Sequence, residues 1–411
     1  MDKALLVMTE TNKRKLHSEL EGLTVYGETP VGWDENTPPN ETLDQYGNLS
    51  ASNRGVVPVA DPRSPSRRVY DDPGVEALRE HLRQHNGIRG IEICEPTEIK
   101  SAARIFHRDG FVVVADLLNA EQLARWREGC ARALRDILSI PGQGNRKYIS
   151  ETGRLPHRYG YGTSSASRQM LHDLAWASMI DLPTTTPILI EIFGSSDYRL
   201  WGSGGDLCLP GAIEYQHLHS DGKDAQHLSE SRIKRAEALG VELKTDSEGN
   251  LDVPTLKLIM EMAAPSVTIN FVMSDLTWEN GPIRQIPGTH TVQQPPPTSA
   301  DEPEWMRLST LVGAPAGAGV FRDVRTWHGA TPNLSREVRA LPNVEYSAPS
   351  RSSEGFKKTL PHEIWETLTP HAQKVCEFVK AEPGVWPPGA GVMHPLASKR
   401  AEASKASDRV L

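Results

Sequence analysis

The apolar positions of this chain follow a helical period in some stretches and form short runs in others. After Asn119, which can cap a helix together with Gln122, apolar side chains recur at helical spacing. Two further helices are expected, at 98–108 with Thr97 as the cap and at 361–380. Short apolar runs between Gly and Pro residues are typical of strands. These runs predict strands at 111–114, 188–192, 198–201, 213–218, 267–273, 319–321 and 344–346.

The expected strands are short, and turns that contain Gly and Pro separate them. This pattern favours a β-sandwich or jelly roll over a parallel sheet, in which longer helices would alternate with the strands. The chain is therefore expected to be mainly β with flanking helices. At 411 residues it is long enough to bury a large core in one domain.

The composition changes at about residue 90, and the predicted strands end near residue 346. Residues 1–90 are rich in Pro, Gly, Asn and Asp and are expected to form an irregular N-terminal arm. Residues 91–346 would form the main domain, interrupted by a helical insert at 222–264. Residues 347–411 would form a C-terminal helix and a tail that pack on the core or flank it.

The insert at 222–264 is longer than a hairpin connection requires. Helices are expected within it at 229–239 and 253–262, on either side of a turn at 247–250. The insert is a candidate lid or subunit contact, and a homo-oligomer could form through it or through the chain termini.

Charge and cysteine content argue against several classes of protein. The net charge is −8 and the basic residues are scattered, so no nucleic-acid partner is expected. The four cysteines are far apart, which argues against a disulfide framework or zinc cluster and favours a reducing, cytoplasmic location. The apolar run at the amino terminus is too short for a signal peptide or a membrane span, so no membrane partner is expected.

Two histidines and an aspartate are spaced as metal ligands. His219 and Asp221 are two residues apart, so in an extended segment they point to the same face. His328 can supply a third ligand from the end of residues 319–328, a stretch with strand character. Two imidazoles and one carboxylate form the facial triad of non-haem Fe(II) oxygenases, which leaves positions open for a cosubstrate and O₂. Arg339 follows His328 by eleven residues (339 − 328), and its guanidinium could bind the far carboxylate of a dicarboxylic cosubstrate.

The order of these residues resembles that of the phytanoyl-CoA dioxygenase family of Fe(II)/2-oxoglutarate-dependent oxygenases. Residues 106–114 (FHRDGFVVV) are similar to the family's opening helix-to-strand turn, and residues 280–282 (NGP) with 286–290 (IPGTH) are similar to its central turn and strand. The resemblance covers residues 97–346 and implies a double-stranded β-helix (jelly roll, cupin-like) core. It also implies that Fe(II), 2-oxoglutarate and O₂ are used to oxidise a small-molecule substrate, with release of succinate and CO₂.

The resemblance also indicates the type of oxidation and further cosubstrate contacts. Asp221 fills the position that chloride takes in related halogenases, so hydroxylation, or another oxidation such as desaturation or ring formation, is expected instead of halogenation. Gln216 stands three residues before His219, where some fungal relatives use a glutamine to contact 2-oxoglutarate. Thr268 and Asn270 share one face of their predicted strand. The cosubstrate would be their partner if that face is the interior, whereas a solvent-facing strand would leave them without this role.

The sequence narrows the reaction but not the substrate. Four residues are candidates for the substrate pocket: Arg158, Tyr159 and Tyr161 from a segment rich in Gly and Tyr, and Arg284 just after the NGP residues. A large apolar cavity would favour a terpenoid or polyketide, and a small cavity lined by arginine would favour an acidic metabolite.

Two other functions fit part of the same motif. Residues 217–221 (HLHSD) also read as His-x-His-x-Asp, the opening motif of the metallo-β-lactamases, although Gly222 stands where that fold has a histidine. The alternatives are therefore a metallo-β-lactamase-like hydrolase and a non-catalytic, metal-binding cupin-like protein.

Other polar and aromatic residues near these motifs are expected to be structural. His290 follows a Pro-Gly pair and would stabilise its own turn. Trp327 would point away from His328 into the core, and Asp323 and Arg325 would pair with each other or contact solvent.

Overall fold

The structure is a computed structural model. It describes residues 91–139, 158–162, 170–210, 216, 218–221, 240–262, 264–291, 309–349 and 356–385, with isolated positions between 73 and 80 and between 233 and 237, and residue 296. Most of the predicted arm at 1–90, of the predicted strand at 213–218 and of the predicted helix at 229–239 therefore lies outside the described residues.

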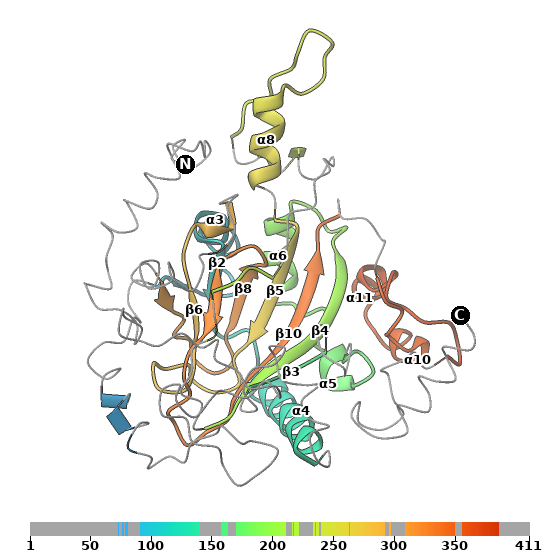
Figure 1. The fold of residues 1–411 in the computed structure, drawn as a ribbon. Helices are drawn as coiled ribbons and strands as arrows, with labels where there is room; N and C mark the ends of the chain where they lie inside the picture. Colours follow the sequence, from blue (N-terminus) through green and yellow to red (C-terminus); the bar gives the residue numbers. More distant parts are fainter. Residues whose placement is uncertain are drawn as a thin grey trace, which may run out of the picture.

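Two β-sheets form the body of the molecule (Figure 1). The larger sheet has seven strands, in the order β1 (Ile93–Cys94), β2 (Phe111–Val114), β8 (Gly319–Asp323), β5 (Ser266–Phe271), β10 (Arg339–Ser347), β4 (Arg199–Cys208) and β3 (Arg158–Tyr161). The smaller sheet has three strands, in the order β7 (Thr310–Leu311), β6 (Ile283–Gln285) and β9 (His328–Ala330). The predicted mainly β, jelly-roll-type fold with flanking helices is confirmed, and the described strands do not close into a barrel.

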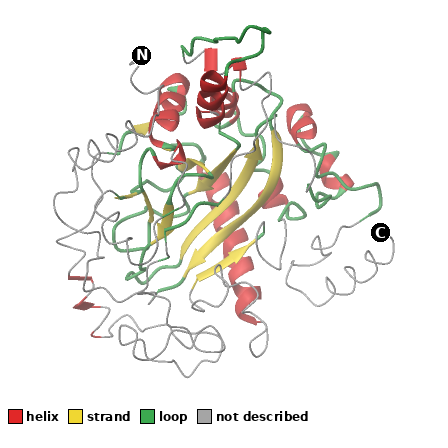
Figure 2. Cartoon of the chain, turned by 45° about the horizontal axis from the view of Figure 1, so that its top comes forward, coloured by secondary structure: helices red, strands yellow, loops and turns green. Residues whose placement is uncertain are grey.

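One face of the seven-stranded sheet is apolar and is covered by helices. The strand register aligns Val112, Phe321 and Ile269 in one row across β2, β8 and β5, and all three are buried in the main core. Trp126 joins this core, with its ring centroid 5.0 Å from that of Phe271. The helices that cover this face include α3 (Ile99–Asp109), α4 (Ala120–Ser139), α5 (Leu174–Ala177) and α6 (Thr186–Phe193). Figure 2 shows the longest of them, α4, lying across the sheet.

The opposite face of the same sheet, the inner face, points toward the three-stranded sheet and is partly polar. Val320 and Leu341 from the larger sheet pack there in one cluster with Ile283 from the smaller sheet. The register also places buried polar and charged side chains on this inner face: Arg158, Thr268, Asn270, Arg322 and Arg339. The interior between the two sheets is therefore both partly apolar and partly charged.

The two predicted helix caps have different outcomes. The N-cap of α3 is Glu98, so the prediction of Thr97 as the cap was wrong. The Glu98 carboxylate accepts a hydrogen bond from the Glu95 backbone N–H at 2.8 Å, so it stabilises the turn that precedes the helix. At α4 the reciprocal cap is confirmed, because Asn119 Oδ1 accepts from the Gln122 backbone N–H at 2.9 Å and Gln122 Oε1 accepts from the Asn119 backbone N–H at 3.0 Å.

Two predicted elements are wrong. Residues 188–192 belong to helix α6 and not to a strand, because a short apolar run does not by itself distinguish a buried strand from a buried helix. The helix predicted at 361–380 is instead two short helices, α10 (His362–Trp365) and α11 (Pro370–Val375). Thr369 accepts a hydrogen bond from the Ala372 backbone N–H and begins the second helix, with Pro370 in its first turn. None of the described helices is long and apolar enough to cross a membrane.

The insert after Asp221 contains the predicted helix at 253–262 as α8 (Val253–Met262), which extends away from the sheets in Figure 1. Ile259 packs with Ala236 and Val241 in a small cluster of its own. The predicted turn at 247–250 forms around Asp246, whose carboxylate accepts from two backbone N–H groups. A role of the insert as a lid or subunit contact stays a prediction.

Candidate metal centre and cosubstrate site

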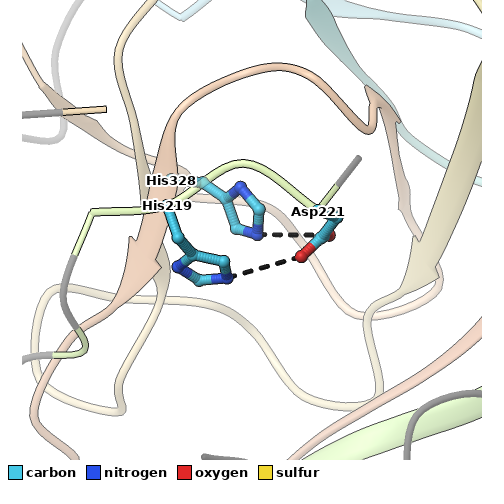
Figure 3. Close-up of side chains that lie close together, drawn as sticks. All are labelled: His219, Asp221 and His328. Carbon is cyan, nitrogen blue, oxygen red and sulfur yellow. Dashed lines mark ion pairs between the residues drawn. The ribbon is translucent and has the colours of Figure 1, made fainter. Parts of the chain in front are cut away.

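Three side chains from two segments of the chain meet between the sheets (Figure 3). One ligand atom from each of His219, Asp221 and His328 lies within 4.8 Å of the other two. His219 Nε2 is 3.4 Å from Asp221 Oδ1, and His328 Nε2 is 3.4 Å from Asp221 Oδ2. The structure thus brings together the three residues that the sequence predicted as metal ligands.

The backbone holds the two histidines side by side. In an antiparallel bridge, the backbone N–H groups of His219 and His328 each donate to the carbonyl of the other residue at 3.0 Å. Directly paired residues point to the same face. The Asp221 backbone N–H donates to the Val324 carbonyl at 2.9 Å and anchors the third ligand. The strand predicted at 319–321 lies within β8, and the stretch at 319–328 divides into β8 and β9, which belong to different sheets.

A buried arginine lies against the carboxylate of the triad. Arg322 Nη2 donates to Asp221 Oδ2 at 2.7 Å, and Arg322 Nη1 lies 3.1 Å from His328 Nδ1. The Asp221 side chain is 39% exposed, and its partial desolvation opposes the charge, but the guanidinium holds the pKa of this carboxyl well below its ordinary value. Burial, reinforced by Arg322, lowers the pKa of His328 to about 4. At neutral pH Asp221 is therefore ionised and His328 is neutral, which are the forms that bind a metal.

The orientation of His328 also suits metal binding. Its Nδ1 lies 2.8 Å from the Thr326 carbonyl, so the neutral ring can donate Nδ1–H to that oxygen and keep the lone pair of Nε2 toward Asp221. Two imidazoles and one ionised carboxylate fit the ligand preference of Fe(II) in a facial triad.

A pair of buried arginines lies on the inner face of the larger sheet. Arg158 and Arg339 are both paired with Cys208, from its two sides, so all three residues share one face. Arg158 is 9% exposed and Arg339 is 2% exposed, whereas Arg336 is exposed. Burial lowers the pKa of Arg339, and the charge of Arg158 also acts to lower it. Two buried cations close together favour an anionic ligand.

Gln216 connects this arginine pair to the triad. Its Oε1 accepts from Arg158 Nη2 at 2.8 Å and from the Ala330 backbone N–H at 3.1 Å. Ala330 lies in β9 two residues after His328, on the same face of the strand. The triad and the arginine pair therefore lie on one continuous part of the interior.

Thr268 and Asn270 also face this interior. Thr268 is paired with Arg322 and Asn270 with Val320, and both polar side chains are buried. None of the described residues gives Asn270 Oδ1 a hydrogen-bond partner. Their strand therefore has the orientation for which contact with 2-oxoglutarate was predicted, and the contact itself stays a prediction.

Three of the four residues suggested for the substrate pocket point away from the triad. Tyr159 and Tyr161 alternate with Arg158 along β3 and lie in the helix-covered core, where the Tyr161 ring packs edge-on against Trp176 at 5.6 Å. Arg284 is paired with Gly329 and so lies on the face of β6 opposite to His328, where its Nη2 donates to the Gln216 carbonyl. Of the four, only Arg158 faces the interior. The other three were suggested wrongly because the register of β3 and β6 could not be assigned from the sequence.

Two residues near the triad had no predicted role. Arg322 contacts Asp221 directly, and Gln285 is paired with His328 in the register between β6 and β9. The available signal was weak. Arg322 directly follows the predicted strand at 319–321, six residues before His328 (328 − 322), and Gln285 is a single amide between Arg284 and Ile286.

The residues that were expected to be structural make contacts with nearby protein groups. His290 Nε2 lies 3.2 Å from the His107 carbonyl, and burial lowers the pKa of His290 to about 4. Arg325 Nη2 forms an ion pair with Asp323 at 2.8 Å, and Trp327 is buried. His217, on which the metallo-β-lactamase motif depends, lies outside the described residues.

The fold and the site together define a class of enzyme. Two facing sheets that carry two histidines and a carboxylate, with buried arginines beyond them, have the architecture of a facial-triad Fe(II) oxygenase with an anionic cosubstrate. Residues 255–341 match the model of the phytanoyl-CoA dioxygenase (PhyH) family, a segment that contains His328 and Arg339 and begins after His219 and Asp221. Over this segment the chain is similar to that family of Fe(II)/2-oxoglutarate-dependent oxygenases, and the facial triad agrees with the similarity.

The chain is also similar to several solved structures, two of them from Streptomyces species. The epimerase SnoN, in complex with Fe3+, alpha ketoglutarate and nogalamycin RO, is 19% identical with a TM-score of 0.42, over 62% of this chain and 84% of that chain. AviO1 from Streptomyces viridochromogenes Tue57 is 16% identical with a TM-score of 0.43, over 62% and 97%. HygX from Streptomyces hygroscopicus, with nickel, 2-oxoglutarate and hygromycin B bound, is 14% identical with a TM-score of 0.40, over 60% and 86%. No curated protein matches the chain in sequence.

Proposed function

We propose that this enzyme hydroxylates a C–H bond of a small-molecule metabolite while converting 2-oxoglutarate and O₂ to succinate and CO₂. The observation that carries the proposal is the triad of His219, Asp221 and His328, with its ligand atoms within 4.8 Å of one another, on the same interior surface as the buried arginine pair. A family assignment alone would not place these groups together.

The residues His219, Asp221 and His328 would hold Fe(II). The bound metal and the keto acid together supply the activation of O₂, which no side chain of the protein can supply. Because Asp221 is a ligand, no position of the triad is left for a halide, and hydroxylation or another oxidation without halogen transfer is favoured.

The arginine pair would hold the cosubstrate. A guanidinium binds a carboxylate through two parallel hydrogen bonds, and Arg339 is the more deeply buried of the two arginines. Arg158, held by Gln216, adds a second positive charge beside it. Thr268 and Asn270 line the same interior, and the Thr268 hydroxyl and the Asn270 amide N–H groups would donate to oxygen atoms of the cosubstrate. The keto acid end of 2-oxoglutarate would then point toward the triad.

Arg322 would keep the triad in its metal-binding form. Its hydrogen bond to Asp221 Oδ2 holds the carboxylate ionised and limits its rotation, which favours Oδ1 as the metal ligand. The Thr326 carbonyl holds His328 in the matching orientation. The protein therefore contributes binding, orientation and charge.

The proposal is tested by adding Fe(II) and 2-oxoglutarate to the metal-free protein under anaerobic conditions. A weak visible charge-transfer band is expected, and His328→Ala should abolish it together with succinate formation. His290→Gln is the matched control, because it changes a second buried histidine outside the triad and should keep the band. A parent protein that shows no band, or that binds two zinc ions and hydrolyses a test ester, would refute the proposal.

A further inference from the structure

Gln285 lies beside the histidines of the triad and has no polar partner among the described residues. Its side chain is fully buried, and neither Nε2 nor Oε1 makes a hydrogen bond. In the register of the smaller sheet Gln285 is paired directly with His328, which in turn is paired with His219. Side chains of directly paired residues begin about 4.5–5.5 Å apart, so the three residues form a row on one face.

That face is the interior face. Ile283, two residues before Gln285 on the same strand, packs into the cluster of Val320 and Leu341 from the larger sheet. His328, on the same face, reaches Arg322 of the larger sheet at 3.1 Å. The Gln285 amide is therefore aimed into the space next to the proposed metal.

An amide in this position is costly in the ligand-free protein. A buried polar group without a partner loses its hydrogen bonds to water and gains none in return, and such groups are rare in native structures unless a ligand or ordered water completes them. Both atoms of Gln285 are in this state, so a complete partner must offer a donor and an acceptor.

The cosubstrate does not meet that requirement. Ionised 2-oxoglutarate carries only acceptor oxygens, and Arg158, Arg322 and Arg339 already offer donors to an anion in this interior. A neutral group with N–H and C=O side by side satisfies both atoms of a glutamine amide through two hydrogen bonds. We propose that Gln285 binds an amide or lactam group of the substrate beside the C–H bond that is oxidised. The inference rests on the proposed function, because it places the substrate next to the triad.

The first test measures thermal unfolding of the ligand-free protein. Gln285→Met keeps most of the side-chain volume and removes both polar atoms, so the melting temperature should rise, by about 2 °C. The control is Thr331→Val, because the Thr331 hydroxyl donates to the Pro282 carbonyl at 2.6 Å and its removal should lower the melting temperature. A fall in melting temperature for Gln285→Met would overturn the proposal, since it would show that the amide stabilises the fold.

The second test uses small probes on the anaerobic complex with Fe(II) and 2-oxoglutarate. The lactam 2-piperidone should shift the charge-transfer band of the parent protein. N-methyl-2-piperidone, which lacks the donor, and cyclohexanone, which lacks the nitrogen, should need at least about tenfold higher concentrations, the cost of losing one hydrogen bond to a buried group. In Gln285→Met the preference for 2-piperidone should disappear.

The remaining outcomes of the second test would each refute the proposal for Gln285 or the proposed function. If no probe shifts the parent band, or if 2-piperidone acts equally on the parent and on Gln285→Met, the amide holds only water and the proposal is wrong. If Gln285→Met loses the band itself, the amide binds the cosubstrate and not the substrate. If the parent shows no band, the proposed function fails, whereas the melting temperature still reports whether the amide of Gln285 lacks a partner.

Discussion

The two faces of the seven-stranded sheet are built from the same strands, yet they differ in chemistry. On the helix-covered face, β5 presents Val267, Ile269 and Phe271, which are fully buried in the main core. On the inner face, the same strand presents Thr268 and Asn270, and Asn270 keeps an oxygen without a partner among the described residues. Adjacent residues of one strand therefore either pack in the apolar core or point into the interior that holds the candidate site.

This difference shows that strand register, more than composition, determines which residues can act. A shift of one residue in the pairing of β5 would move its apolar side chains to the inner face and its polar side chains under the helices. Each apolar side chain that is fully buried contributes about 1.5–3 kcal/mol. The helix-covered face can thereby offset the cost of burying charged and amide groups on the other face.

The largest effect is expected on the helix-covered face. Trp126 is fully buried, its ring contacts Phe271, and its indole N–H donates to Ser178 Oγ at 3.0 Å. Trp126→Ala should lower the free energy of unfolding by about 3–5 kcal/mol, measured by urea denaturation, because it opens a large cavity. The band formed by Fe(II) and 2-oxoglutarate should persist. A folded variant without the band would contradict the separation of the two faces.

The next effect is expected on the inner face, where Arg339 is buried and Arg336 is not. Removing one partner of a buried charged hydrogen bond costs about 2–5 kcal/mol, or roughly 30-fold to several thousand-fold in affinity. Arg339→Ala should therefore raise the 2-oxoglutarate concentration for half-maximal succinate formation by at least about tenfold. Arg336→Ala should stay within about twofold of the parent, as for an exposed arginine. The opposite ranking would mean that the cosubstrate lies elsewhere.

The candidate metal ligands could be predicted from the sequence because their chemistry is specific at short range. The spacing of His219 and Asp221 places both on one face of any extended segment, whatever the rest of the fold. His328 and Arg339 followed from their order and separation along the chain. The structure brings the first three together and buries the fourth.

Properties that depend on long-range pairing could not be predicted in the same way. Tyr159 and Arg158 are neighbours in the sequence, and only the pairing of β3 with β4 shows that Arg158 shares a face with Arg339. Gln285 shares a face with His328 through the pairing of β6 with β9, although the two are 43 residues apart (328 − 285). The helix at 186–193 was missed because its apolar run is too short to show a period.

A smaller effect on stability is expected for His290, which is buried like His328 but is not a candidate metal ligand. His290 and His328 are both buried, and burial lowers the pKa of each to about 4, but only His328 belongs to the triad. An unfolded histidine has a pKa near 6.5, so the contribution of His290 to stability is complete above about pH 6.5 and is lost as the pH falls toward 4. The difference of about 2.5 between the two pKa values corresponds to at most about 3 kcal/mol.

His290→Gln should therefore flatten the decline in the free energy of unfolding between about pH 6.5 and pH 4, measured by urea denaturation of the metal-free protein. The variant should still form the band with Fe(II) and 2-oxoglutarate at neutral pH. An unchanged pH profile would show that His290 takes up its proton without unfolding, and that its burial does not determine its charge.

The smallest effect is expected at the start of α4, which covers the apolar face. Asn119 Oδ1 accepts a hydrogen bond from the Gln122 backbone N–H at 2.9 Å, and Asn119→Ala leaves that donor without its cap. The free energy of unfolding should fall by about 1 kcal/mol, and Asn119→Asp, which keeps an acceptor oxygen, should stay close to the parent. The 2-oxoglutarate concentration for half-maximal turnover should not change in either variant. A change in Asn119→Ala alone would show that the helices on one face influence the ligand site on the other.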